Sequence, residues 1–200
     1  MLDAGLQLVD DEGLAALTIR RLASDLDVGT MTIYSYVRDK DDLLDGITQR
    51  ALRTLTIPSP GPDWEPRLSR AIGELYRVLR QHPGATQILA DGLVPGPTLD
   101  PAREGLLAIL RIAGFAPGDA TRHLNALFGF ALGFAAVAGH HPEPSSEEQA
   151  RIAALPADRY PYLVESATAF AARFSQASFD SGLQLLLTGL RSALPAHQDC

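Results

Sequence analysis

A short run of hydroxyl, thioether and phenol side chains is the stretch of this chain best suited to contact another molecule. It consists of Thr30, Met31, Thr32, Tyr34 and Tyr36. Hydroxyl and phenol groups can hydrogen-bond to base edges or phosphates, and apolar side-chain atoms can contact thymine methyl groups. Cations flank the run at Arg20 and at Lys40, which is the only lysine of the chain. The pattern indicates contact with nucleic acid.

Two short helices and a turn are predicted to position these groups. Thr18 can cap the first helix, because its hydroxyl accepts a hydrogen bond from an unpaired backbone N–H. Apolar residues then recur at helical spacing through Leu22, Ala23 and Leu26. Asp27-Val28-Gly29 breaks this pattern, and Val28 is expected to fill the angle between the helices.

The second helix and its successor complete the unit. Thr30 can cap the second helix, whose buried side would carry Ile33 and Val37, and Asp39 can cap a third helix that begins at Lys40. This layout is that of a helix-turn-helix, which places its second helix in the DNA major groove. The alternative is an ordinary three-helix unit with solvated charges.

The charge balance predicts a local basic patch on an acidic body. The net charge is −7, and residues 1–55 carry six cations against ten carboxylates, which gives −4. A chain that coats nucleic acid nonspecifically is expected to be basic. We therefore expect weak nonspecific binding, operator binding that depends on base contacts and dimerisation, and a shallow salt dependence.

The rest of the chain is predicted to be helical. The 200 residues are 46% hydrophobic and contain neither an internal repeat nor strand-like alternation. The breaker 57–62 (IPSPGP) is the best domain boundary. His140 to Asp158 is predicted to be a long mobile loop with one helical turn near 147–154. The predicted helices span residues 2–12, 40–55, 63–81, 85–92, 100–113, 119–139, 160–174 and 178–194.

The helix-turn-helix segment resembles the DNA-binding domain of the tetracycline-repressor (TetR) family of transcription regulators. The matching positions are Leu17-Thr18, Leu22-Ala23, Leu26, Val28, Thr32-Ile33-Tyr34, Tyr36-Val37, Lys40 and Leu43-Leu44. The similarity continues to the end of the chain through 129–134 (GFALGF) and 179–194. It implies an all-α fold with an N-terminal three-helix helix-turn-helix domain (1–55) and a C-terminal helical regulatory and dimerisation domain (56–200).

The resemblance also implies roles for individual residues. Arg20 would contact a base or a phosphate, and Lys40 would hold a phosphate at the start of the next helix. Thr30, Met31 and Thr32 would face the bases, whereas Tyr34 and Tyr36 would lie against the backbone or the bases. Two departures stand out. Ile19 replaces a polar residue that could contact phosphate, and Asp27 stands where such turns often have Gly.

Dimerisation is predicted through the helices near 119–139 and 178–194. The first is apolar nearly all round, with Gly129 and Gly133 between its large residues, so two of its faces must be buried. One face can pack within its own domain, and the other can meet a second subunit. In the family these two helices pair with their copies. The alternative is that both faces are buried within one subunit.

A small-molecule effector is implied by the family, whose regulatory domain encloses a mostly apolar pocket. The candidate lining residues are Trp64, Tyr76, His82, Gln87, Phe115, His123, Asn125 and Phe128. Each of them could equally be plain core or surface. Positions that supply metal and drug contacts in tetracycline repressor correspond to apolar residues here, among them Ile88. The resemblance therefore argues against a tetracycline–magnesium effector.

The sequence gives little support for catalysis or for metal binding. No Ser/His/Asp or Cys/His set has the spacing of a nucleophilic site, so we predict neither an enzyme nor a cofactor. His140-His141 invites a metal-site reading, but adjacent histidines in a Pro-rich loop are usually just exposed, and we predict no metal. The single cysteine, Cys200, and the lack of a signal peptide or membrane span favour the cytoplasm.

The sequence thus predicts a ligand-responsive, DNA-binding transcriptional regulator that a small molecule releases from a double-stranded operator. A repressor is favoured. The alternative is a helical small-molecule-binding or interaction protein that no longer reads DNA. The acidic N-terminal domain and Ile19 motivate this alternative, and a negative outer face at 30–36 would support it.

Overall fold

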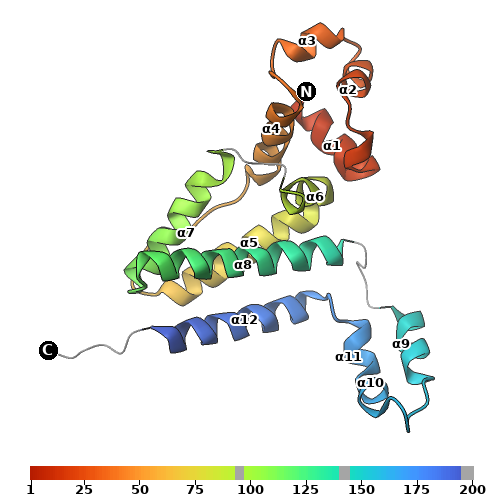
Figure 1. Ribbon diagram of the computed structural model, residues 1–200, viewed down its shortest axis with the longest axis vertical. Helices are drawn as coiled ribbons and strands as arrows, with labels where there is room; N and C mark the ends of the chain where they lie inside the picture. The colour runs from red at the N-terminus through yellow and green to blue at the C-terminus, as the bar shows by residue number, and fades with distance from the viewer. Residues whose placement is uncertain (93–96, 140–144, 195–200) are drawn as a thin grey trace, which may run out of the picture.

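The computed structural model describes residues 1–92, 97–139 and 145–194 (Figure 1). Over these ranges the chain is helical and forms no strand, as the sequence predicts. Residues 140–144, which include His140 and His141, lie outside the described residues, so the reading of these histidines is untested.

Residues 1–55 form a compact unit of short helices. These are α1 (Leu2–Glu12), η1 (Leu14–Ala16), α2 (Ile19–Asp25), α3 (Thr30–Tyr34) and α4 (Lys40–Leu52). The helix α1 ends where predicted, because Gly13 adopts a φ of 83°, which only glycine takes easily. The core of the unit contains Leu22, Ile33, Leu43 and Ile47, which are 0–1% exposed.

The Pro-rich connection 57–62 leads into the larger helical part of the molecule. Its main helices are α5 (Trp64–Gln81), α6 (Pro83–Ala90), α7 (Asp100–Ile112), α8 (Pro117–Ala138) and α12 (Gln176–Ala193). The helices α5, α8 and α12 pack on one another, and α7 covers α5 and α8 near the start of α8 (Figure 1). Tyr76 of α5 stacks on Phe179 of α12, with ring centroids 3.8 Å apart. No helix within the described ranges is long and apolar enough to cross a membrane.

Several predicted element bounds need correction, among them the start of α12, which begins two residues earlier than predicted, at Gln176. The helix α6 begins at Pro83, two residues earlier than predicted, because proline is well suited to the first helical position. The helix α4 ends three residues earlier than predicted, at Leu52. The predicted helix 160–174 is two helices, α10 (Pro161–Glu165) and α11 (Ala167–Ala171), because Ser166 leaves helical geometry with φ −92° and ψ 8°.

The predicted loop 140–158 contains more helix than expected. The helix α9 (Ser146–Ala153) has eight residues, and the Ser145 side chain caps it by accepting a hydrogen bond from the Glu148 N–H at 3.1 Å. The helices α9, α10 and α11 pack mainly on one another and form a lobe beyond the end of α8 (Figure 1).

The end of α1 and the start of α6 join the N-terminal unit to the larger helical part. The Asp10 carboxylate accepts a hydrogen bond from the Gly84 N–H at 2.9 Å, and its other oxygen lies 2.8 Å from His82 Nδ1. A Cβ added at Gly84 would overlap the Val9 carbonyl group, so only glycine permits this approach. The two parts also share one continuous hydrophobic core.

Candidate nucleic-acid interface and ligand cavity

The turn between α2 and α3 has the geometry that a helix-turn-helix needs. The Thr18 side chain caps α2 by accepting a hydrogen bond from the Arg21 N–H at 3.0 Å, as predicted. Asp27 adopts a left-handed backbone with a φ of 52°, which Asp tolerates better than most residues. Val28 is 39% exposed, so the prediction that it fills the angle between the helices is wrong.

The cap of α3 also differs from the prediction. Gly29 is the N-cap residue, with φ −73° and ψ 150°, and Thr30 is the first helical residue. No side chain caps the start of α3, so the prediction that the Thr30 hydroxyl caps this helix is wrong. Asp39 caps α4 as predicted, since its carboxylate accepts a hydrogen bond from the Asp42 N–H at 2.8 Å.

The outer face of α3 and the residues after it are open to solvent. Ile33 and Val37 point inward and are at most 6% exposed. Met31 is 78% exposed, Tyr36 is 73% exposed and Tyr34 is 48% exposed. Thr30 and Thr32 are also exposed. The predicted contact residues therefore share one accessible surface.

The arginines near this surface differ from one another in their pairing. Arg21 forms ion pairs with Glu12 at 2.6 Å and with Asp25 at 2.9 Å. Arg38 pairs with Asp42 at 3.2 Å. Through its hydrogen bonds, the Arg21 guanidinium holds the pKa of the Glu12 carboxyl below its ordinary value. Arg21 is therefore largely committed to a structural role.

Arg20 and Lys40 remain available. Within the described part of the chain, neither lies within ion-pairing distance of a carboxylate, and both are exposed. The sequence between them contains Asp25, Asp27 and Asp39, but no carboxylate from Val28 to Arg38. The outer face of 30–36 is thus polar and aromatic with free cations at its borders, and it lacks the carboxylates that would have supported a protein that no longer reads DNA.

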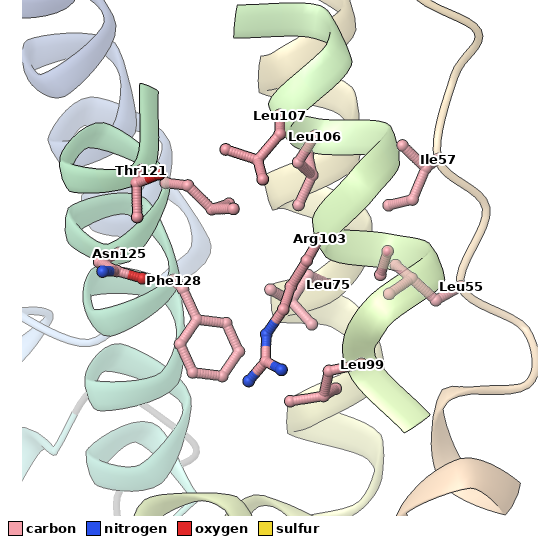
Figure 2. A pocket seen from close by; sticks show the side chains of 12 residues that line it. Leu55, Ile57, Leu75, Leu99, Arg103, Leu106, Leu107, Thr121, Asn125 and Phe128 are labelled. Atoms are coloured by element: carbon pink, nitrogen blue, oxygen red, sulfur yellow. The ribbon is translucent and has the colours of Figure 1, made fainter. Parts of the chain in front are cut away.

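A cavity of about 300 Å³ lies between α5, α7 and α8, and the segment after α4 forms part of its wall (Figure 2). Three polar side chains line it: Arg103 of α7, and Thr121 and Asn125 of α8. The other lining residues are apolar: Leu55, Ile57, Leu75, Leu99, Ala102, Leu106, Leu107, Leu124 and Phe128. Such a space suits a small, mostly apolar molecule that makes a few polar contacts.

Two of the eight predicted ligand contacts, Asn125 and Phe128, lie on this wall. Three others form an aromatic group elsewhere, because Phe115 packs edge-on against Trp64 and His123 with centroids 5.9 Å and 4.8 Å away. The remaining three have their own partners. Tyr76 stacks on Phe179, His82 pairs with Asp10, and Gln87 donates a hydrogen bond to Asp91.

Four lining residues with polar or connecting roles were not predicted. Arg103 and Thr121 carry polar groups, and Leu55 and Ile57 belong to the connection between α4 and α5. Arg103 sits in the first turn of α7, where periodicity marks it only as a solvated residue. No local signal shows that these four residues meet, because packing of distant segments brings them together.

Comparison with known proteins decides the family. Residues 1–47 match the family described as "Bacterial regulatory proteins, tetR family", and residues 57–194 match the one described as "Tetracyclin repressor-like, C-terminal domain". The chain belongs to the TetR family. It is a ligand-responsive, DNA-binding regulator, and the all-α fold with an N-terminal helix-turn-helix agrees with this assignment. Members of the TetR family bind operators and small molecules as dimers and are generally not enzymes.

Individual relatives support the assignment. The HTH-type transcriptional repressor DrrR1 of Streptomyces coeruleorubidus is 30% identical over 137 residues, which cover 68% of this chain and 51% of DrrR1. An HTH-type transcriptional regulator of Saccharopolyspora erythraea is 29% identical, with 95% of this chain and 82% of the relative covered. The solved structure of ActR from Streptomyces coelicolor with actinorhodin is 26% identical and has a TM-score of 0.86, with 98% of this chain and 95% of ActR covered.

Proposed function

We propose that this TetR-family protein is a repressor that an organic effector releases from its operator by binding in the cavity between α5, α7 and α8. Two relatives support the proposal. DrrR1 is named a transcriptional repressor, and ActR has been solved with actinorhodin. The observation that carries it is the presence of Leu55 and Ile57 in the cavity wall.

Those two residues connect the ligand site to the DNA-binding unit. They follow α4, the last helix of that unit, by three and five residues. Gly105 of α7 approaches this segment closely, since a Cβ placed there would lie 2.8 Å from Ile57 Cγ2. A ligand that pushes α7 and Ile57 apart would displace α4. Release requires only that the ligand bind the free form better than the DNA-bound form by a few kcal/mol.

The DNA contacts follow from the exposed surface around α3. Thr30, Met31 and Thr32 face the bases, and Tyr34 and Tyr36 contact bases or backbone. Arg20 contacts a base or phosphate, and Lys40 holds a phosphate. Because few free cations are present, log affinity should fall gently with log salt. A slope that corresponds to about ten or more released counterions would contradict this surface.

The dimer that presents two such surfaces is proposed to form through α8 and α12. Leu185 of α12 is 72% exposed and Val137 of α8 is 41% exposed. At Gly129 and Gly133 an added Cβ would meet nothing within 4 Å, so a partner helix could approach there. In the isolated chain this face is open, contrary to the alternative in which one subunit buries it.

Sedimentation measures the dimer proposal directly. Leu185→Asp places a charge in the proposed interface and should give a monomer at concentrations where the wild type is a dimer. Met31→Asp, at the equally exposed Met31 on α3, is the matched control and should remain dimeric. A dimeric Leu185→Asp protein would rule out this face.

Three further proposals complete the account. Residues 1–55 act as the DNA-binding domain, with α4 linking it to residues 56–200. The protein acts in the cytoplasm and catalyses no reaction. Support comes from the family assignment.

The test of the function is an electrophoretic shift assay with DNA that flanks the protein's own gene. The wild type should bind a discrete fragment, and Tyr34→Ala and Lys40→Ala should bind it more weakly. Binding that is absent in the wild type, or unchanged in both variants, would overturn the proposed function.

A further inference from the structure

The polar groups of the cavity are one cation and two neutral groups. Arg103 contributes a guanidinium, Thr121 a hydroxyl and Asn125 an amide, and none of the cavity-lining residues carries a carboxylate. Figure 2 shows Arg103 extending from α7 toward Phe128 of α8. The cavity is therefore apolar with a single formal charge, and that charge is positive.

The charge of Arg103 is only partly neutralised. Its Nη1 donates one hydrogen bond of 3.2 Å to Asp100, one turn earlier in α7. The Arg103 and Asp100 side chains are 52% and 65% exposed, so this pair is screened by water and weak. A guanidinium has five N–H donors in a planar fork, and four of them remain for another anion.

The protein as a whole repels anions, because its net charge is −7. A local cation therefore favours the binding of a negatively charged ligand, because charges close to the site are screened least. Arg103 is the one cation among the residues that line the cavity. This placement makes it the selective element of the site.

We propose that the effector is a small, largely apolar organic anion, such as an aromatic carboxylate or sulfonate, whose acidic group binds Arg103. Its hydrocarbon body packs against Leu106, Leu124 and Phe128, and Thr121 and Asn125 hydrogen-bond to its remaining polar atoms. The inference rests on the proposed function, since it assigns the chemistry of the ligand at the same cavity.

A matched pair of fluorescent probes tests the charge preference. The anion 8-anilinonaphthalene-1-sulfonate and the neutral N-phenyl-1-naphthylamine share an aromatic skeleton and differ by the sulfonate. Dissociation constants are measured for the wild type, Arg103→Ala, Arg103→Lys and Arg122→Ala. Arg122 is the matched control because it is also exposed, pairs with Asp119 three residues earlier, and does not line the cavity.

Arg103→Ala should bind the sulfonate about tenfold more weakly and the neutral probe within about twofold of the wild type, as expected for loss of a charge-assisted hydrogen bond. Arg103→Lys should retain part of the preference, and Arg122→Ala should behave as the wild type. Equal changes for both probes, or a preference lost equally in Arg122→Ala, would overturn the inference.

Ala102→Trp identifies the binding site, because an indole at that position fills the cavity. Both probes should lose affinity in this variant, with helical content and melting temperature checked by circular dichroism. Unchanged binding of both probes would place them elsewhere and overturn the inference. Probe binding does not depend on operator binding. A failed charge preference therefore leaves the proposed function standing, whereas a failed shift assay removes the proposed function without changing the charge preference measured for the cavity.

Discussion

The surface around α3 is assembled from one short stretch of chain, residues 18–40, whereas the cavity is assembled from segments between Leu55 and Phe128. In the first region, side-chain caps such as Thr18 to Arg21 and Asp39 to Asp42 span only three residues. In the cavity, residues more than seventy positions apart, such as Leu55 and Phe128, line the same space. Local sequence therefore constrains the first region strongly and the second weakly.

The two regions also differ in what an individual substitution can do. On the α3 surface the exposed side chains contribute little to folding, so they can be exchanged to change the partner. In the cavity most of the apolar lining residues also belong to the hydrophobic core, so a change at one of them alters ligand binding, core packing and coupling to the DNA-binding unit together. Variants at closely spaced positions can separate these effects.

The largest effect should come from Arg20→Ala, compared with Arg21→Ala. Loss of one Arg–base contact costs about 1–3 kcal/mol, and a dimer loses two, so operator affinity should fall about thirtyfold or more. Arg21 is held by Glu12 and Asp25, and Arg21→Ala should change affinity by less than about threefold. Fluorescence anisotropy with labelled operator measures both; equal losses would remove the distinction between free and paired arginines.

The contact between α1 of the N-terminal unit and α6 should be the next most sensitive point. Gly84→Ala forces α6 away from α1, because the new methyl group overlaps the Val9 carbonyl. The free energy of unfolding should fall by about 1–3 kcal/mol, as for other overpacked sites. Gly73→Ala is the control, since a Cβ there meets nothing within 4 Å and helix propensity favours Ala. Urea unfolding compares the two, and a Gly84→Ala protein as stable as the wild type would show that α1 and α6 do not need this contact.

A smaller effect is expected where the cavity meets the DNA-binding unit. Gly105→Ala crowds Ile57 much as a ligand would, so it should weaken operator binding about tenfold without effector, within the cost of overpacking one methyl group. The same Gly73→Ala control should bind as the wild type does. Operator affinity that does not change in Gly105→Ala would exclude the Leu55–Ile57 segment as the coupling element.

The smallest effect should come from the ion pair between Arg191 of α12 and Glu65 of α5. The Arg191 guanidinium, chiefly through its hydrogen bonds, holds the pKa of the Glu65 carboxyl below its ordinary value. This contribution is therefore present above the ordinary pKa of Glu and is lost as the pH falls through the lowered pKa. Arg191→Ala should be slightly less stable than the wild type at pH 7, and the difference should shrink as the pH falls below the ordinary pKa of Glu. Unfolding curves from neutral to acidic pH check this, and a difference that stays constant in acid would contradict it.

Much of the fold could be predicted from the sequence, because the relevant signals are local. Gly13, Thr18 and Asp39 mark helix ends through backbone geometry or caps that involve neighbours in the chain. Helical periodicity gives α5, α7, α8 and α12 to within a few residues. Local reasoning failed where two signals compete, as at Thr30, where Gly29 takes the cap position instead.

The site divides in the same way. The exposed residues around α3 could be predicted because Ile33 of the helix points inward and leaves its other side chains outside. Val37 is buried as predicted, but it follows α3, which ends at Tyr34. The cavity could be predicted only at Asn125 and Phe128. Arg103 and Ile57 could not be, because their sequence neighbours do not show which distant helices pack around them. His82 was predicted to line the cavity, but it pairs with Asp10 instead. Asp10 lies 72 positions away, so the local sequence does not indicate this partner.

The most direct test of the central claim is selection of genomic DNA fragments by the purified protein, with Arg20→Ala as the reference. The account predicts enriched fragments that share two inverted half-sites spaced for two α3 surfaces, with the DNA beside the protein's own gene among them. If the wild type enriches no fragment over Arg20→Ala, the claim that this surface reads DNA is contradicted.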